Sequence, residues 1–119
     1  MSSKARTPEL GDIFFVTLNP VTGRELQGDL RPVLVLTPAT FNRMTPPLCA
    51  PITQGGTWAR VEGFAVTLTG AGTKTQGAAI VSQVRPLDLV ARNAWYVETA
   101  PEEVVVDALF RLQGIFSTD

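Results

Sequence analysis

The sequence predicts a small α+β domain in which several short, mostly antiparallel strands form a partly closed barrel and one helix follows them. Three observations indicate this fold class. The chain has 119 residues, which suits a single domain spanning 1–119, with residues 1–10 expected to be loosely ordered. Short β-branched and aromatic runs alternate with turns rich in Gly and Pro as far as Glu98. Beyond Pro101, apolar residues recur at helical spacing.

The first half of the chain predicts two strands and a helical turn. DIFFVTL, residues 12–18, is rich in strand-forming residues, and Asn19-Pro20 ends it. Residues 19–30 form a loop long enough to carry function. The continuous apolar run PVLVLT, residues 32–37, predicts a buried strand. Residues 38–44 then predict one helical turn, with Thr37 as its N-cap and Pro38 at its first helical position.

Four more strands are expected before the helix. LCAPIT, residues 48–53, is one of them, and Pro51 predicts that its end lies at an edge or a bulge. GFAVTLT, residues 63–69, alternates like a half-buried strand after a tight turn at Gln54. AAIVSQV, residues 78–84, and AWYVE, residues 94–98, follow further turns.

The C-terminal segment predicts an amphipathic helix. Thr99 and Glu102 fit a capping box at its start. The apolar residues that recur at helical spacing are Val104, Val105, Ala108, Leu109, Leu112, Ile115 and Phe116.

Composition excludes several classes of chemistry. The chain has no histidine, which removes His-based triads and the commonest acid–base catalyst. A single cysteine, Cys49, cannot form an intramolecular disulfide, and its apolar neighbours favour a buried, inert thiol over a reactive one. No cofactor or metal site is expected. No apolar run is long enough to span a membrane and no signal peptide is recognised, so a cytoplasmic protein is expected.

Charge is distributed unevenly along the chain. Net charge is −1 overall. Residues 1–97 hold nine basic against six acidic residues, which gives +3, and residues 98–119 hold one against five, which gives −4. A mildly basic body of this kind can still bind RNA where its cations cluster.

Five motifs, taken together, resemble the MazF/PemK toxin family, and the PemK (Kid) and ChpB branch most of all. They occur in the family's order between Gly11 and Phe116: GDIFFVTLNPVTGRELQG, RPVLVLTPATFNR, PITQGGTWARVEGFAVTL, QVRPLDLVAR and ALFRLQ. The resemblance implies an SH3-like five-stranded antiparallel barrel with a C-terminal helix, assembled as a homodimer. It also implies a metal-independent, sequence-specific endoribonuclease that cuts single-stranded RNA, chiefly mRNA, and leaves a 2′,3′-cyclic phosphate. The implied partner is an antitoxin whose acidic C-terminal segment blocks the RNA groove.

Three residues carry the chemistry that the resemblance implies. Arg31, directly before the proline of the second strand, stands where the family uses an arginine at the phosphate. A guanidinium matches phosphate geometry and stabilises its developing charge. Thr53 ends the third strand and assists at the phosphate, while Glu25 is the acid of the first loop and acts as a base or orients that loop. Each residue also has a structural alternative. Arg31 would be a solvated arginine at a strand end, Thr53 a hydroxyl that caps the following turn, and Glu25 an exposed loop carboxylate.

The sequence also departs from the PemK branch. Arg24 replaces the first-loop histidine of that branch, and Ile80 and Ser82 replace its Arg-x-Asp pair. Relative to the usual spacing of the family, there is one extra residue between Gly28 and Arg31, which could shift the loop against Arg31. ChpB-like members also carry an aliphatic residue at the first of the two strand positions, so activity need not be lost, but an attenuated or inactive homologue stays an alternative.

The remaining candidates are residues that would contact the RNA chain. Trp58 follows a Gly-Gly turn and would stack on an unpaired base. Trp95 is expected in the core or at the dimer interface. The residues expected to bind RNA are Arg24, Gln27, Trp58, Arg60, Gln83 and Arg85.

A different function class stays open. CcdB gyrase poisons share this fold and block a protein target with the C-terminal end of the helix, where Phe116 is the candidate contact. Arg31 and Thr53 would be unnecessary for such a poison.

Overall fold

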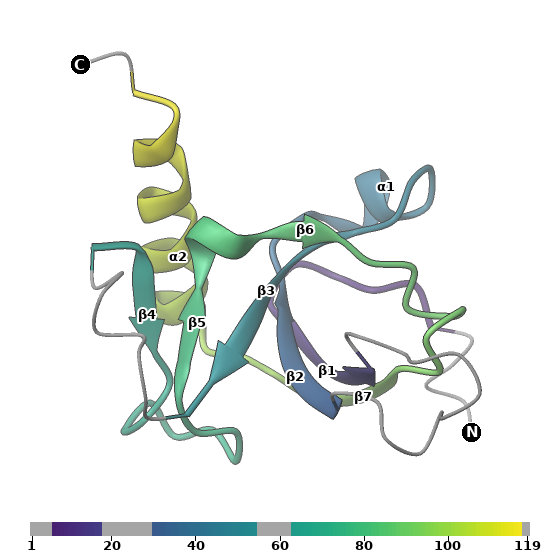
Figure 1. The fold of residues 1–119 in the computed structure, drawn as a ribbon, viewed down its shortest axis with the longest axis horizontal. Coiled ribbons are helices and arrows are strands. Elements are labelled where there is room, and N and C mark those ends of the chain that lie inside the picture. Colours follow the sequence, from purple (N-terminus) through teal and green to yellow (C-terminus); the bar gives the residue numbers. More distant parts are fainter. Residues whose placement is uncertain (1–5, 18–29, 55–62, 118–119) are drawn as a thin grey trace.

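The computed structural model describes residues 6–17, 30–54 and 63–117 (Figure 1). Its elements, in chain order, are β1 (Asp12–Thr17), β2 (Leu30–Val35), α1 (Ala39–Asn42), β3 (Leu48–Thr53), β4 (Ala65–Thr67), β5 (Ala78–Ile80), the 3₁₀ helix η4 (Val81–Gln83), β6 (Arg85–Pro86), β7 (Trp95–Thr99) and α2 (Glu102–Ile115). In the part of the chain that the structure describes, no helix has the length and apolar character needed to cross a membrane.

The strands form one antiparallel sheet in the order β4-β5-β3-β2-β1-β7. The short strand β6 pairs with β3 off this path. In Figure 1, α2 stands beside β4 and β5 at one side of the molecule, and α1 lies at the other. This arrangement confirms the predicted α+β class with a C-terminal helix.

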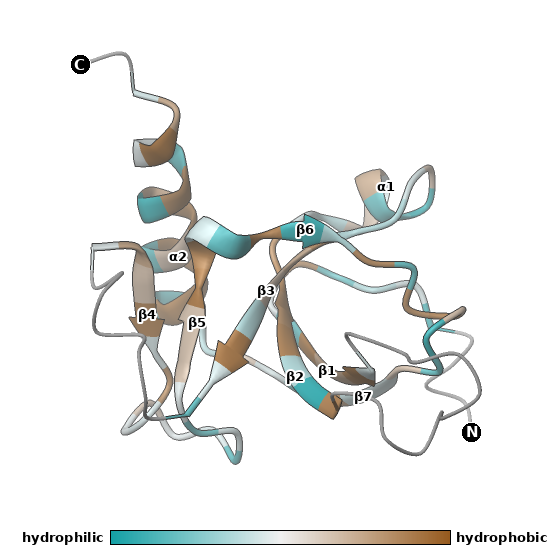
Figure 2. Cartoon of the chain, in the orientation of Figure 1, coloured by the Kyte–Doolittle hydropathy of each residue, from teal (hydrophilic) through white to brown (hydrophobic). Residues whose placement is uncertain are grey.

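Buried residues form a core on each face of the sheet, which explains the apolar runs in β1 and β2. Figure 2 shows the hydrophobic stretch of β2 in brown. One core packs β1, β2 and β3 against β4, β5 and α2 and includes Ile13, Leu34, Ile52, Val66 and Ala108. The second core lies on the opposite face and includes Phe14, Val33, Cys49, Leu87 and Leu89. Alternate residues of β1 and β2 therefore enter different cores.

Several predicted strands have different bounds: the strand predicted over residues 63–69 covers only Ala65–Thr67, and those over 12–18 and 94–98 differ by one residue at their ends. β2 begins at Leu30, two residues before the predicted Pro32, because Leu30 and Arg31 pair with Thr17 and Val16 of β1. The strand predicted over residues 78–84 ends at Ile80. β5 pairs with the end of β3 at Ile52 and Thr53, whereas β6 pairs with its start at Leu48 and Cys49. The 3₁₀ turn η4 therefore carries the chain along β3 from one pairing site to the other.

Pro51 does not place β3 at an edge of the sheet. β3 is an interior strand, paired with β2 on one side through Val33 and Pro51. On its other side, β6 ends its pairing at Cys49 and β5 begins at Ile52. The proline therefore occupies the interval between these two partners, where a missing N–H breaks no ladder.

Neither predicted helix cap is formed. The N-cap residues are Pro38 for α1 and Pro101 for α2, without a side-chain cap in either. Thr37 instead donates from its hydroxyl to Asn42 Oδ1 at 2.6 Å and accepts from the N–H of Leu48 at 3.1 Å. Thr99 bonds to the β1 strand, as described below. The hydroxyls of Thr37 and Thr99 therefore bond to Asn42, Leu48 and Asp12 and do not cap the helices.

Candidate active site

Arg31 and Thr53 lie side by side at the ends of two adjacent strands. Val33 of β2 pairs with Pro51 of β3, so continuing this antiparallel register by two residues places Arg31 opposite Thr53. Their side chains meet, with Arg31 Nη1 donating to Thr53 Oγ1 at 3.5 Å. The structure thus brings together two of the three residues expected to carry chemistry.

The pair lines an open groove of about 770 Å³. The apolar part of its lining comes from three strands and from the start of β2: Phe15, Leu30, Pro32, Ile52, Trp95 and Val97. The polar part is completed by Gln54 and by the turn formed by Lys74, Thr75 and Gln76. Arg31 and Lys74 are the charged residues among these, so the described lining carries positive charge, as a phosphate site requires.

Glu98 holds the 74–76 turn in place from β7. Its carboxylate accepts hydrogen bonds from the main-chain N–H of Lys74 at 3.0 Å, and from the N–H and hydroxyl of Thr75 at 2.8 and 2.7 Å. Partial burial raises the pKa of Glu98, but these hydrogen bonds and the charge of Lys74 outweigh it, so the pKa lies below the usual value of 4.5. A charged carboxylate therefore fixes one wall of the groove, a contact that nothing in the sequence pattern indicated.

Gly77 allows β5 to approach Thr53 closely. Its φ is +112°, a backbone conformation that residues with a side chain rarely adopt. A Cβ at this position would clash with the carbonyl oxygen of Thr53. The glycine therefore lets the start of β5 lie against the end of β3, which carries Thr53.

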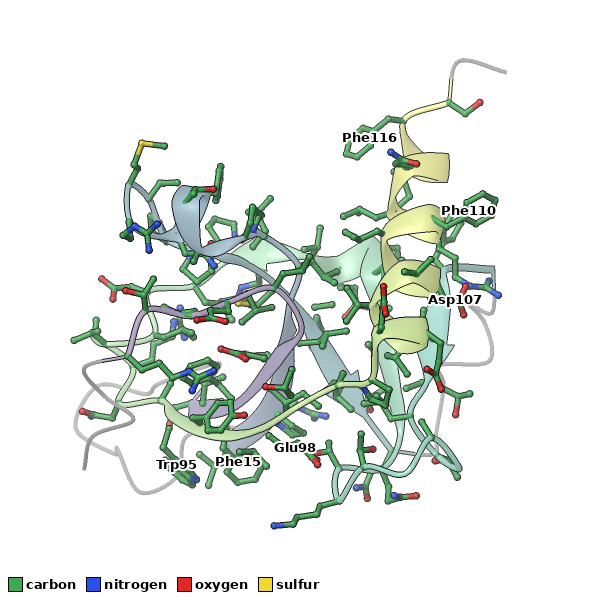
Figure 3. The ribbon with its side chains drawn as sticks, turned by 180° about the vertical axis from the view of Figure 1, so that it is seen from behind. Phe15, Trp95, Glu98, Asp107, Phe110 and Phe116 are labelled. Carbon is green, nitrogen blue, oxygen red and sulfur yellow. The ribbon has the colours of Figure 1, made fainter. Side chains whose placement is uncertain are left out.

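Trp95 is not in the core, contrary to one of the two expectations for it. Its side chain is 45% exposed, and it lines the groove beside Phe15. The two ring centroids are 5.3 Å apart, and Figure 3 shows the rings next to each other.

Gln83 and Arg85 lie away from the groove. Both are exposed, on η4 and on β6, and not on a long fifth strand. Arg85 pairs with Cys49, four residues before Thr53 on β3, which corresponds to roughly 13 Å along a strand. Ile80 is buried and Ser82 is exposed. The other expected residues, Arg24, Glu25, Gln27, Trp58 and Arg60, lie outside the described residues.

Cys49 is fully buried, which confirms the expected inert thiol. Desolvation raises the pKa of its thiol from 9.0 to about 12. A thiolate is therefore scarce at neutral pH, and the residue takes no part in the chemistry of the groove.

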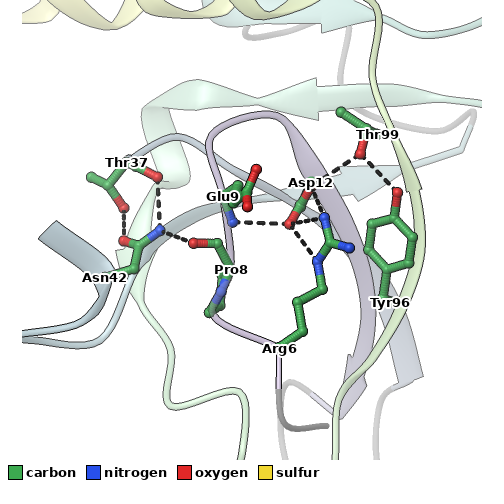
Figure 4. Close-up of polar contacts among 8 residues, drawn as sticks. All are labelled: Arg6, Pro8, Glu9, Asp12, Thr37, Asn42, Tyr96 and Thr99. Carbon is green, nitrogen blue, oxygen red and sulfur yellow. Dashed lines mark hydrogen bonds and ion pairs between the residues drawn. The ribbon is translucent and has the colours of Figure 1, made fainter. Parts of the chain in front are cut away.

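A second polar cluster anchors the segment before β1 (Figure 4). Asp12, only 1% exposed, forms an ion pair with Arg6 at 3.1 Å and accepts from Thr99 Oγ1 at 3.0 Å. Arg6 also lies over the ring of Tyr96, 4.0 Å from its centroid. Asn42 Nδ2 donates to the carbonyl of Pro8 at 2.8 Å. Within residues 6–10, Arg6 therefore contacts the sheet and Pro8 contacts α1.

The chain matches the model of the PemK-like, MazF-like toxin family of type II toxin–antitoxin systems over residues 9–116. It belongs to this family. The chain is 44% identical to Endoribonuclease PemK of Escherichia coli over 110 residues, which are 92% of this chain and 82% of that protein. It is 47% identical to Endoribonuclease toxin ChpB of Escherichia coli strain K12 over 107 residues, covering 90% and 92% of the two chains.

The fold agrees with solved structures of the family. The MazE–MazF structure (Form-II) of Deinococcus radiodurans superposes with a TM-score of 0.79 at 29% identity, covering 96% of this chain and 99% of that one. Both the suspected family and the expected fold are thus confirmed.

Proposed function

We propose that this chain is the endoribonuclease toxin of a type II toxin–antitoxin system and that its groove, with Arg31 and Thr53, binds the phosphate that is cut. Its relatives PemK and ChpB are named endoribonucleases. The observation that carries the site assignment is the contact between Arg31 and Thr53 in an open, positively charged groove.

The proposed reaction is attack of a ribose 2′-oxygen on the adjacent phosphorus. The new 2′-O–P bond gives a 2′,3′-cyclic phosphate as the bond to the 5′-oxygen breaks. Charge accumulates on the phosphoryl oxygens of the transition state, and Arg31 stabilises it with a planar pair of donors. The Thr53 hydroxyl orients the guanidinium and donates a further hydrogen bond to the phosphate.

Two proton transfers complete this reaction. The 2′-hydroxyl loses its proton and the leaving 5′-oxygen gains one. With no histidine in the chain, Glu25 is the proposed base for the first transfer. It stays a prediction, because Glu25 is outside the described residues.

The proposed substrate is single-stranded RNA, chiefly mRNA, which is cut at specific sequences without a metal ion. An unpaired strand presents bases that an apolar groove floor can contact, whereas a duplex hides them. Such an enzyme acts in the cytoplasm, where mRNA is translated.

The proposed partners are a second copy of the chain and a cognate antitoxin. An acidic segment of the antitoxin would compete with RNA for the charges of Arg31 and Lys74 in the groove. Apolar side chains exposed on α2 and at its C-cap suit a protein interface: Val106, Phe110, Ile115 and Phe116. Phe116 is thus not the single large apolar candidate on this helix.

The test is cleavage of a long single-stranded RNA by the purified protein in EDTA. Wild-type protein is expected to cut it, and Arg31→Ala to lose about 100- to 1,000-fold in kcat, the cost of removing a transition-state charge donor. Arg43→Ala is the matched control, since Arg43 is exposed at the end of α1, outside the groove. Equal activity of Arg31→Ala and wild type would overturn the site assignment.

Two alternative functions predict different results in this assay and on expression of the protein in cells. A gyrase poison leaves RNA intact and induces a DNA-damage response on expression. A degenerate homologue binds RNA without cutting it and does not arrest growth.

A further inference from the structure

Phe15 and Trp95 form an aromatic pair that reaches the groove from two strands. They are cross-strand partners in the β1–β7 register, and their rings are tilted by 58° at a centroid distance of 5.3 Å. Phe15 is half-buried, whereas Trp95 leaves 45% of its surface exposed. Phe15 therefore supports the indole from one side and leaves the remainder of its surface open.

Side chains alternate between the two faces along β1 and β7, so Phe15 and Trp95 line the groove whereas their neighbours Phe14 and Tyr96 face the second core. Phe14 and Tyr96, also cross-strand partners, meet edge to face in the second core with centroids 5.9 Å apart. Successive strand residues point to opposite faces. Trp95 thus lies on the face of Phe15 and lines the groove, and Arg31, whose cross-strand partner Val16 belongs to the second core, enters the same groove from the start of β2.

The distance between Trp95 and the phosphate site suits a neighbouring nucleotide. Phe15 pairs with both Trp95 and Pro32, and Pro32 directly follows Arg31. Trp95 is therefore two strands away from the start of β2, which is roughly 10 Å across the sheet. An exposed indole that lines one groove with a guanidinium is an arrangement typical of sites where bases stack.

The apolar side chains of α2 form a separate surface. Figure 3 places Phe110 and Phe116 on the helix, away from Phe15 and Trp95. Those residues do not line the groove. A role for Trp95 can therefore be tested without disturbing the apolar surface of α2.

We infer that Trp95, supported by Phe15, is the platform on which one unpaired RNA base stacks beside the phosphate held by Arg31. This inference rests on the proposed endoribonuclease function. Trp95 is then a positioning residue, which sets the register of the strand in the groove and touches neither the phosphorus nor the attacking oxygen. It also gives this chain a preference for substrates with a strongly stacking base at that position.

The kinetic test compares Trp95→Phe with Trp95→Leu. Leucine keeps an apolar side chain but has no aromatic face, whereas phenylalanine can still stack. Trp95→Leu is expected to raise KM about tenfold with little change in kcat, within the range for loss of one stacked base. Trp95→Phe should recover most of this loss. Equal KM values for Trp95→Leu and wild type, or a fall in kcat and melting temperature together without a rise in KM, would overturn the inference.

The binding test uses tryptophan fluorescence and a mixed-sequence 2′-O-methyl RNA, which has no free 2′-hydroxyl for attack. Quenching is expected with wild-type protein and should be smaller in Trp95→Phe, in which the remaining tryptophan, Trp58, reports only the base expected to stack on it. Undiminished quenching in Trp95→Phe would contradict a stacking role. Loss of dimer on size-exclusion chromatography of Trp95→Leu would instead assign the residue to a contact between copies.

Failure of this inference is distinguishable from failure of the proposed function. If wild-type protein cuts RNA and the Trp95 variants behave like it, only the platform is wrong. If wild-type protein does not cut RNA at all in the EDTA assay, the proposed function itself is wrong.

Discussion

Arg31 Nη1 lies 3.5 Å from Thr53 Oγ1, and the two residues face each other across β2 and β3. The contact is long for a hydrogen bond, and the proposed function assigns a bound phosphate as the partner of both side chains. Because both residues stand at strand ends, the sheet fixes their backbones while their side chains remain in the groove.

Thr53→Val should lower cleavage while leaving the fold intact, because valine matches threonine in shape and also favours strands. Loss of one hydroxyl hydrogen bond is worth about 1 kcal/mol, so kcat should fall roughly tenfold. The measurement is steady-state RNA cleavage beside thermal unfolding. Thr67→Val on β4 is the control, since Thr67 is exposed and does not line the groove. Equal effects of the two substitutions would contradict a role for the Thr53 hydroxyl.

Gly77→Ala should reduce both stability and cleavage. The positive φ is strained for any residue that has a Cβ, and the new Cβ of alanine clashes with the carbonyl oxygen of Thr53. We expect a loss of about 1–3 kcal/mol in the free energy of unfolding. Gly72→Ala is the matched control, because Gly72 also has a positive φ, of +92°, but has open space around it. Gly72→Ala should lose stability and keep its cleavage rate per folded molecule, and reduced cleavage in both variants would argue against a local effect at Thr53.

Glu98→Gln should destabilise the protein at neutral pH and much less in acid. The folded-state pKa of Glu98 is lowered, so its stabilisation is fully present above the unfolded value of about 4.5 and is lost as pH falls through the lower folded pKa. The difference in urea unfolding between wild type and Glu98→Gln should therefore shrink below pH 4.5. Glu103→Gln, at an exposed site in the first turn of α2, is the control. If the stability difference between wild type and Glu98→Gln stays constant down to pH 2, the charged Glu98 carboxylate does not stabilise the 74–76 turn.

Cys49 should react with thiol reagents only when the protein opens. Its side chain is fully buried, and desolvation raises the pKa of the thiol to about 12. Labelling at pH 8 should thus be slow in the native protein and fast in denaturant, as followed by the release of a chromogenic thiol. Fast labelling of the native protein would show that the second core opens readily.

The elements of the fold follow mainly from local sequence. Alternating or continuous apolar runs predicted β1, β2 and β3, and the helical spacing after Pro101 predicted α2. Because the chain has no histidine, arginine was the side chain expected to stabilise charge at the phosphate, and the family resemblance singled out Arg31 and Thr53. Their contact agrees with this, because two strands in antiparallel register bring those positions opposite each other.

The positions of several side chains depend on the order in which the strands pair, and only the tertiary structure decided that order. Thr99 resembles a helix cap locally, yet its hydroxyl bonds to Asp12, 87 residues away in the chain. Gln83 and Arg85 follow β5 in sequence, yet the turn at η4 takes them to the other end of β3. Trp95 reaches the groove through its pairing with Phe15. Periodicity encodes which face of a strand is apolar, but it does not specify which distant strand lies beside it, and that choice placed these side chains.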